Sequence, residues 1–306
     1  MKILTHPTCQ DHQVPEGHPE RPQRLSSLLD HLERTGFAQD HAILHAPKAD
    51  TEDILRAHPS HYLSELEKLS PTEGINPVDP DTWMSPDSYA AACIAAGATC
   101  AGVDLLLSDQ EKRVFCAVRP PGHHAERSGA MGFCLFNSVA IGALRALEHP
   151  DIHRVAILDF DVHHANGTVD IFMDQPEVLV CSTFQHPHYP NRLFDIAAPN
   201  IINSPLPAGS GSFEFRQAIE KDWMPALERH QPNLILVSAG FDAHAHDPLA
   251  NLNLFEDDYD WVTRIIVAAA NQFAQGRVLS TLEGGYDLEA LCNSVTAHLD
   301  ALVVQG

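Results

Sequence analysis

The chain has 306 residues, of which 44% are hydrophobic, and its formal net charge at pH 7 is -22. A chain of this length can bury a large core, either as one large α/β domain or as two smaller ones. The negative charge argues against nucleic acid as a partner, since proteins that follow phosphates carry basic patches; cationic substrates stay open.

The start of the chain and its cysteines indicate where the protein works. The first residues, MKILTH, lack the features of a secretory signal, and we find no apolar run of the roughly 20 residues that cross a bilayer. The seven cysteines form no CxxC pair and are odd in number. We therefore expect a soluble, cytoplasmic protein with reduced thiols and no membrane partner.

The N-terminal third predicts two helices separated by a long loop. Leucines three and four residues apart predict a helix over 21–35 that Gly36 ends. The proline-rich stretch 70–87 predicts a surface connection. Ser85 followed by Pro86 predicts the N-terminus of a long alanine-rich helix.

From about residue 90 onward, predicted strands alternate with predicted helices. The apolar, β-branched runs of strands buried on both faces lie at 114–118, 155–159, 178–182, 234–238 and 278–282. Further helices are expected near 137–148, 213–230, 257–275 and 287–303, with a kink at Pro225. The alternation predicts one α/β domain over 1–306, with a central parallel sheet flanked by helices.

Four of these strands end in polar sequence. RPPGHH follows the strand at 114–118, DFDVHH closes the one at 155–159, AGFDAH follows 234–238, and EGGYD follows 278–282. The loops at the carboxyl ends of parallel strands face one crevice, so we expect the four clusters to converge there.

Asp161, His163 and Asp242 are candidate ligands of a metal ion. Residues two apart in an extended segment point the same way, so Asp161 and His163 can share one ion, and Asp242 can add a third ligand. Two carboxylates and one imidazole suit Zn²⁺ and leave a position open, and such a site also accepts Fe²⁺. The alternative is a hydrogen-bonded polar strand end that binds no metal.

His123, His124 and Tyr286 are candidate catalytic residues beside that metal. One histidine of the pair can act as general base and the other as its electrostatic partner. Asp159 can accept the far N–H of one histidine, and Asn166 can orient the other. The Tyr286 hydroxyl can donate to a substrate carbonyl. The alternatives are an incidental histidine pair and a core tyrosine.

With these residues identified, the chain resembles the zinc-dependent histone deacetylase superfamily, which includes the acetylpolyamine amidohydrolases. The matching stretches are HPERPQR at 18–24, RPPGHHAE at 119–126, GFCLFNSVA at 132–140, DFDVHHANGT at 159–168, SAGFDAHAHDPL at 238–249 and LEGGYDL at 282–288. They are more similar to the class II branch and its bacterial relatives than to class I. The resemblance implies an arginase-like α/β fold.

The resemblance also implies roles for single residues. It places Zn²⁺ on Asp161, His163 and Asp242, and makes His124 the general base and acid with His123 as its electrostatic neighbour. Tyr286 would polarise the acyl carbonyl. The positions of the substrate tunnel and its surroundings match Phe133 and Tyr189 as aromatic walls, Gly132 beside the first wall, Asp81 at the rim, and Arg21 near an internal acetate-release cavity.

Two potassium sites are a further implication of the resemblance. The first would use Asp159, Asp161, His163, Ser182 and Thr183, and the second would use Phe172, Gln175, Val178 and Asn200.

The expected function is a zinc-dependent deacylase for acetyl- or acyl-lysine in a protein, peptide or small molecule. The alternative is an acetylpolyamine amidohydrolase, but Leu249 stands where polyamine-selective members carry a glutamate. An arginase-like ureohydrolase with two metal ions and a non-catalytic binding module for acylated amines are the other candidates. The sequence leaves the oligomeric state open.

Overall fold

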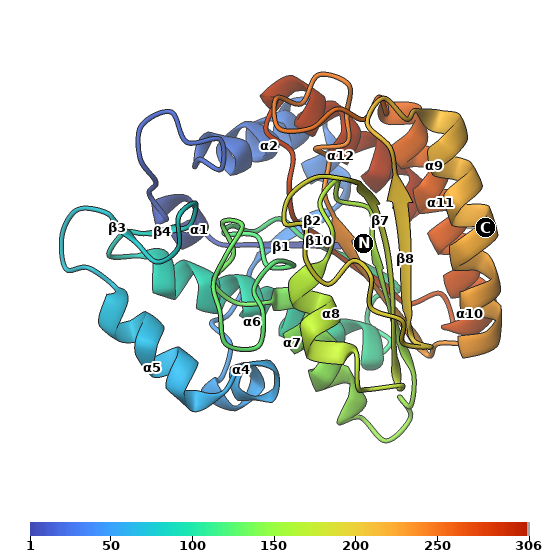
Figure 1. Ribbon diagram of the computed structural model, residues 1–306, viewed down its shortest axis with the longest axis horizontal. Helices are drawn as coiled ribbons and strands as arrows, with labels where there is room; N and C mark the ends of the chain where they lie inside the picture. Colours follow the sequence, from blue (N-terminus) through green and yellow to red (C-terminus); the bar gives the residue numbers. More distant parts are fainter. Residues whose placement is uncertain (305–306) are drawn as a thin grey trace.

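The central feature is a sheet of eight parallel strands in the order β2-β1-β5-β10-β9-β6-β7-β8, seen in a computed structural model that describes residues 1–304 (Figure 1). The strands are β1 (Lys2–Thr5), β2 (Ala42–His45), β5 (Arg113–Cys116), β6 (Val155–Asp159), β7 (Val178–Gln185), β8 (Ile201–Leu206), β9 (Leu234–Ala239) and β10 (Val278–Leu282). All five predicted strands are confirmed. The strands β1, β2 and β8 were not predicted.

Helices cover both faces of this sheet (Figure 1). They are α1 (Thr8–Asp11), α2 (Gln23–Arg34), α3 (Phe37–Asp40), α4 (Thr51–Ala57), α5 (Ser60–Leu69), α6 (Ser88–Leu107), α7 (Ser138–Leu147), α8 (Asn166–Phe172), α9 (Ser212–Ala218), α10 (Met224–His230), α11 (Glu256–Phe273) and α12 (Leu288–Val303). Helices α6 and α7 pack on one face, and α11 and α12 pack on the other. The predicted α/β architecture is therefore confirmed.

The central strands are apolar because they are buried on both faces. Every residue of β6, β7, β9 and β10 is buried, whereas the edge strand β2 has an exposed, mixed pattern. A continuous apolar run is typical of a strand covered on both sides. An edge strand such as β2 does not carry this signal, which is why it was not predicted.

Helix α6 begins later than predicted. Its N-cap is Asp87, so the prediction of Ser85 as the cap was wrong. The backbone N–H of Ser85 donates instead to the hydroxyl of Ser88, at 2.7 Å. The predicted loop before the helix contains a small antiparallel pair, β3 (Asn76–Pro77) and β4 (Trp83–Met84).

Helix α6 also corrects the statement that no apolar run approaches the length of a membrane span. An 18-residue window of this 20-residue helix has a mean hydropathy of 1.8, which meets the length and composition of a span, but 72% of that window is buried inside the domain. A core helix that is covered on several sides has the same composition.

The segment predicted as one helix over 213–230 is divided in the structure. A π-helical turn, η1 (Ile219–Trp223), separates α9 from α10, and Pro225 is the second residue of α10. Proline has no N–H to donate to the preceding turn, and π turns interrupt the regular helical ladder. The π-helical turn therefore ends at Trp223, two residues before Pro225.

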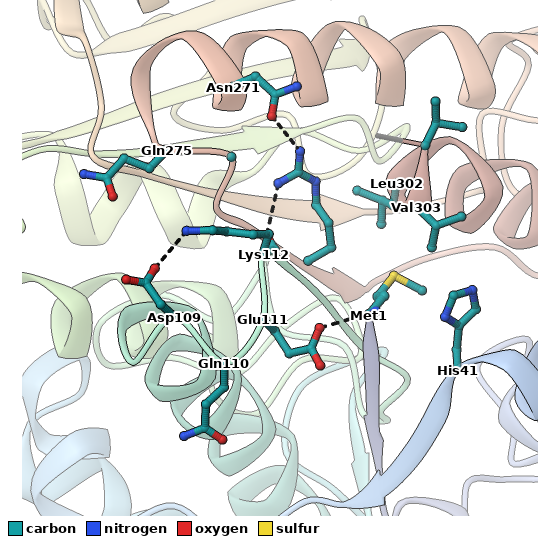
Figure 2. Close-up of a pocket in the computed structure, with 13 residues that line it drawn as sticks. Met1, His41, Asp109, Gln110, Glu111, Lys112, Asn271, Gln275, Leu302 and Val303 are labelled. Atoms are coloured by element: carbon teal, nitrogen blue, oxygen red, sulfur yellow. Dashed lines mark hydrogen bonds and ion pairs between the residues drawn. The ribbon is translucent and has the colours of Figure 1, made fainter. Parts of the chain in front are cut away.

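A cavity of about 800 Å³ lies near the amino ends of β1 and β5. Figure 2 shows that its charged groups pair with one another: Lys112 with Asp109 at 2.8 Å, and the amino terminus of Met1 with Glu111 at 3.3 Å. The catalytic candidates all lie at the opposite, carboxyl ends of the strands.

Candidate active site

Four adjacent strands bring the polar clusters together. β5, β10, β9 and β6 are consecutive in the sheet, and their carboxyl ends align, with Cys116 opposite Thr281, Thr281 opposite Ser238, and Ser238 opposite Asp159. The polar loops follow these four ends directly. The structure thus places the four clusters around one point, as the strand pattern predicted.

Asp161, His163 and Asp242 lie at the centre of this arrangement. One ligand atom from each residue lies within 4.8 Å of the others, and all three side chains are buried. Asp242 Oδ2 is buried and accepts no well-aligned hydrogen bond from any residue from 1 to 304, although His163 Nδ1 lies 3.2 Å away. Burying a carboxylate oxygen without a partner is costly unless a cation compensates it. The donor set and its unpaired oxygen therefore fit a zinc ion.

The electrostatics of the three residues agree with a cation. Burial alone lowers the pKa of His163, but Asp161 and Asp242 outweigh burial and raise this pKa to about 10. Its Nδ1 atom lies 3.0 Å from Asp161 Oδ1 and 3.2 Å from Asp242 Oδ2. When no ion is bound, His163 holds a proton between the two carboxylates, and this proton supplies the positive charge. A divalent cation can take the place of the proton.

Two glycines leave the space that the carboxylates occupy. A Cβ atom on Gly284 would lie 2.6 Å from Asp161 Oδ2 and closer still to Asp242 Oδ2. A Cβ on Gly240 would lie 2.5 Å from the Cγ of Asp161. Any larger residue at either position would displace the carboxylates, so both glycines are needed for close approach.

The histidine pair lies beside the three ligand candidates, and the Nδ1 atom of each ring has a polar partner. His123 Nδ1 lies 2.9 Å from Asp159 Oδ2, and His124 Nδ1 lies 2.6 Å from Asn166 Oδ1. Burial lowers the pKa of His123, but Asp161 and Asp159 more than reverse the effect and raise it well above its usual value. Burial, reinforced by His123, lowers the pKa of His124. His123 therefore favours the charged form, which suits an electrostatic partner. His124 favours the neutral form, which a general base needs in order to accept a proton.

Tyr286 is held above the site by its backbone. Gly285 has φ 119°, a conformation that favours glycine, and the N–H of Tyr286 donates to Asp247 Oδ2 at 2.7 Å. Asp247 Oδ1 accepts the N–H of Leu249 at 2.9 Å, so one carboxylate fixes two residues of the pocket wall. Burial raises the pKa of Tyr286 well above its usual value, which keeps the phenol protonated as a hydrogen-bond donor.

A narrow cavity of about 180 Å³ leads to these groups. Its lining contains Asp81, His124, Gly132, Phe133, His163, His188, Tyr189, Leu249 and Tyr286. The Phe133 ring stands edge-on to Tyr286, with centroids 5.8 Å apart, and the Tyr189 ring stands edge-on to His124 at 5.3 Å. The structure thus places the predicted wall and rim residues around a single cavity.

Asp81 supports one wall of the cavity from below the rim. Its Oδ1 accepts the backbone N–H of Gly132 at 3.0 Å, and the neighbouring Thr82 hydroxyl accepts the N–H of Phe133 at 3.0 Å. Phe133 has φ 70°, which is uncommon for a side chain of this size. The two hydrogen bonds hold this conformation, and they direct the ring into the cavity wall.

His188 is a cavity residue that sequence reasoning missed. Its ring stacks on His163 with centroids 5.3 Å apart and an angle of 19° between planes, and its Nε2 donates to the carbonyl of Leu249 at 3.1 Å. It precedes Tyr189, which was identified by resemblance. A lone histidine in a loop has no partner at a regular spacing, so the sequence predicted a role for Tyr189 but not for His188.

Arg21 does not occupy the position expected for it. Its side chain is exposed at the surface, so it does not line an internal cavity. Arg24, three residues later, is fully buried and donates from Nε to the carbonyl of Gly285 at 2.6 Å. The carboxylate of Glu20 lies between two arginines. Its Oε1 accepts from Nη1 of Arg24 at 3.1 Å, and its Oε2 accepts from Nη2 of Arg119 at 2.7 Å. One helical turn separates the two arginines of HPERPQR, and the sequence alone did not show which one faces inward.

Glu283 is another residue near the site that the sequence analysis did not identify. It is 1% exposed, and its Oε2 accepts the backbone N–H of Gly122 at 2.6 Å and that of His123 at 3.2 Å. Its Oε1 accepts from the Ser238 hydroxyl at 3.1 Å. Glu283 therefore ties β10 to the loop that carries the histidine pair. A charged residue at the end of a buried strand was the signal that could have found it.

The residues of the second expected potassium site also converge. Asn200 Nδ2 donates to the carbonyl oxygens of Phe172, Gln175 and Val178 at 2.8, 3.1 and 2.9 Å. Three carbonyls that point at one place resemble a cation site, but here the nitrogen of the Asn200 amide, with its two hydrogens, lies at that place. In the first expected site, Asp159 on β6 lies opposite Ser182 on β7, next to Thr183. Both potassium sites stay predictions.

The chain is similar to known proteins in both sequence and fold. Residues 18–302 match the family model described as the histone deacetylase domain. A Synechocystis protein, slr0245, is 40% identical, over 95% of this chain and 96% of its own length. A Pseudomonas aeruginosa protein named histone deacetylase-like amidohydrolase is 39% identical, over 88% of this chain and 73% of its own.

A solved structure resembles the whole fold. The crystal structure of the HDA15 HD domain superposes with a TM-score of 0.93 and 29% sequence identity, covering 100% of this chain and 91% of that one. The family model, the relatives and the structural match agree, so the chain belongs to the histone deacetylase family of hydrolytic enzymes.

Proposed function

We propose that the protein is a zinc-dependent deacylase that hydrolyses the amide of acetyl- or acyl-lysine, or of a related acylated amine. The observation that carries the proposal is the buried cradle of Asp161, His163 and Asp242. Its Asp242 Oδ2 accepts no well-aligned hydrogen bond from residues 1–304, and its His163 lines a narrow cavity together with His124. Zinc bound there would act as a Lewis acid and lower the pKa of a bound water.

The chain's own residues supply the proton transfers. His124 is the general base, because its Nδ1 is engaged by Asn166, and its Nε2, which has no hydrogen-bond partner within residues 1–304, can take a proton from water. His123, paired with Asp159, carries positive charge and stabilises negative charge that develops nearby. His124 then returns the proton to the leaving amine. The phenol of Tyr286 donates to the acyl oxygen as it becomes an oxyanion.

The cavity selects the form of the substrate. Its volume of about 180 Å³ is below the roughly 300–1,000 Å³ of pockets for drug-sized ligands, so it suits a single extended chain. Phe133 and Tyr189 provide aromatic walls for methylene groups. Leu249 lines the same cavity and offers no charge to a distant ammonium, which favours acyl-lysine over acetylpolyamine.

A substrate panel tests the proposal. We expect the zinc-loaded protein to release the acid from acyl-lysine peptides faster than from acetylated polyamines. An Asp242→Asn variant should lose both zinc and activity. Faster turnover of polyamines would reverse the substrate preference, and urea formation from guanidines would favour an arginase-like reaction. Tight binding without turnover would indicate a binding module.

A further inference from the structure

Glu126 follows the histidine pair in the sequence, and its side chain reaches the amide of Asn166. Asn166 is fully buried at the start of α8, and its Nδ2 lies 2.8 Å from Glu126 Oε1. The same Nδ2 lies 3.3 Å from the carbonyl oxygen of His124 and 3.2 Å from the sulfur of Met131. All three neighbours of this atom are hydrogen-bond acceptors.

These acceptors determine which way the amide points. If the amide were turned by 180°, its oxygen would face the carboxylate of Glu126, and two acceptors would be opposed without a proton between them. The amide oxygen of Asn166 must therefore face His124 Nδ1, 2.6 Å away. An amide oxygen only accepts, so Nδ1 carries the ring hydrogen and Nε2 carries the lone pair.

The amide of an asparagine needs neighbouring acceptors to orient it, whereas the carboxylate of an aspartate does not. Both carboxylate oxygens of an aspartate accept, so an aspartate at this position would fix the Nδ1–H form by itself. The two ends of an asparagine amide differ, and a donor facing Nδ1 would select the inactive Nε2–H form. Arg192 Nε lies 3.0 Å from Glu126 Oε1 and holds the carboxylate toward the amide.

We propose that Glu126 is a positioning residue that fixes the base-competent tautomer of His124 through the amide of Asn166. It makes no direct contact with the His124 ring. The inference rests on the proposed role of His124 as general base, and its main readout does not depend on catalysis.

A double-mutant cycle tests the coupling. Glu126→Met keeps the length of the side chain and removes the carboxylate. In the parent chain, this change should lower kcat by on the order of tenfold, with KM and zinc content unchanged, because a misdirected amide leaves part of the protein in the wrong tautomer. In an Asn166→Asp background the carboxylate introduced at position 166 would face that of Glu126, so the same change removes a repulsion and should not lower kcat. Equal losses in both backgrounds would overturn the proposal, because a merely structural role predicts equal losses.

The tautomer can be observed directly by nitrogen-15 NMR of the histidine ring. We expect the Nδ1–H form of His124 in the parent and a rise of the Nε2–H form in Glu126→Met. An unchanged tautomer would overturn the proposal even if the protein cleaves no acylated amine, so this failure is distinct from a failure of the proposed function. Asp170→Ala is the matched control, because Asp170 holds the same loop through the N–H of Arg127 at 2.8 Å. It should leave the tautomer of His124 unchanged, and a shift as large as that in Glu126→Met would also overturn the proposal.

Discussion

Substituting Gly284 with alanine should strongly weaken metal binding while the fold is kept. The added Cβ would lie 2.6 Å from Asp161 Oδ2, and ordinary contacts begin at 3.4 Å, so this oxygen must retreat by about 0.8 Å. Asp242 Oδ2 must move farther, because it is closer to the added atom. Zinc–oxygen bonds are roughly 2.0–2.2 Å long and tolerate changes of only about 0.2 Å, so at least one ligand is lost.

The magnitude follows from the loss of ligand geometry. Disturbing a residue that only supports a zinc ligand typically weakens binding about 10- to 100-fold. Moving the ligands themselves should weaken zinc binding by at least about 100-fold, or roughly 2.7 kcal/mol. Overpacking should lower the free energy of unfolding of the metal-free protein by about 1–3 kcal/mol.

Zinc affinity can be measured by competition with a chromophoric chelator, and folding by urea denaturation of the metal-free protein. Gly129→Ala is the matched control, since its Cβ would meet no atom within 4 Å, and it should bind zinc like the parent. Zinc affinity in Gly284→Ala within about threefold of the parent would refute the claim that the two carboxylates close on the ion.

Two further variants test the chemistry and the core. Tyr286→Phe should reduce kcat by on the order of 10²–10³ without loss of zinc, because one donor to the oxyanion disappears; near-parental turnover measured with an acyl-lysine peptide would remove Tyr286 from the mechanism. His298 lies between Thr263 and Ser280, and burial lowers its pKa to about 3. Its contribution to stability is complete above the unfolded pKa near 6.5 and is lost as the pH falls, by about 1.4 kcal/mol per pH unit. Compared with His298→Gln, the parent should therefore lose about 2 kcal/mol more between pH 6.5 and pH 5 in urea denaturation, and parallel pH profiles would contradict this.

The fold of the C-terminal two thirds was predictable because its strands are buried on both faces. Runs such as those of β6 and β9 are continuous in apolar residues, and a parallel sheet then determines where their polar ends meet. The short strand β1 and the exposed edge strand β2 have no comparable run. The helix start at Ser88 was misjudged, because Ser85 hydrogen-bonds to the Ser88 hydroxyl through both its backbone N–H and its side chain, which the Ser85–Pro86 pattern does not reveal.

The site was predictable where spacing carries information. Asp161 and His163 are two residues apart in an extended segment, so their common direction follows from backbone geometry. Long-range partners have no such signature. Arg24 and Glu283 depend on contacts between elements far apart in the chain, and His188 depends on the path of a loop. Only the tertiary structure shows that these three side chains reach the site.

The central claim is that one divalent ion, held by Asp161, His163 and Asp242, drives amide hydrolysis. The most direct measurement is elemental analysis of the purified protein combined with acetate release from an acetyl-lysine peptide on the same sample. The account predicts one zinc per chain and acetate release in proportion to bound zinc. Two transition-metal ions per chain, or a zinc-saturated protein that releases no acid from any acylated amine, would contradict it.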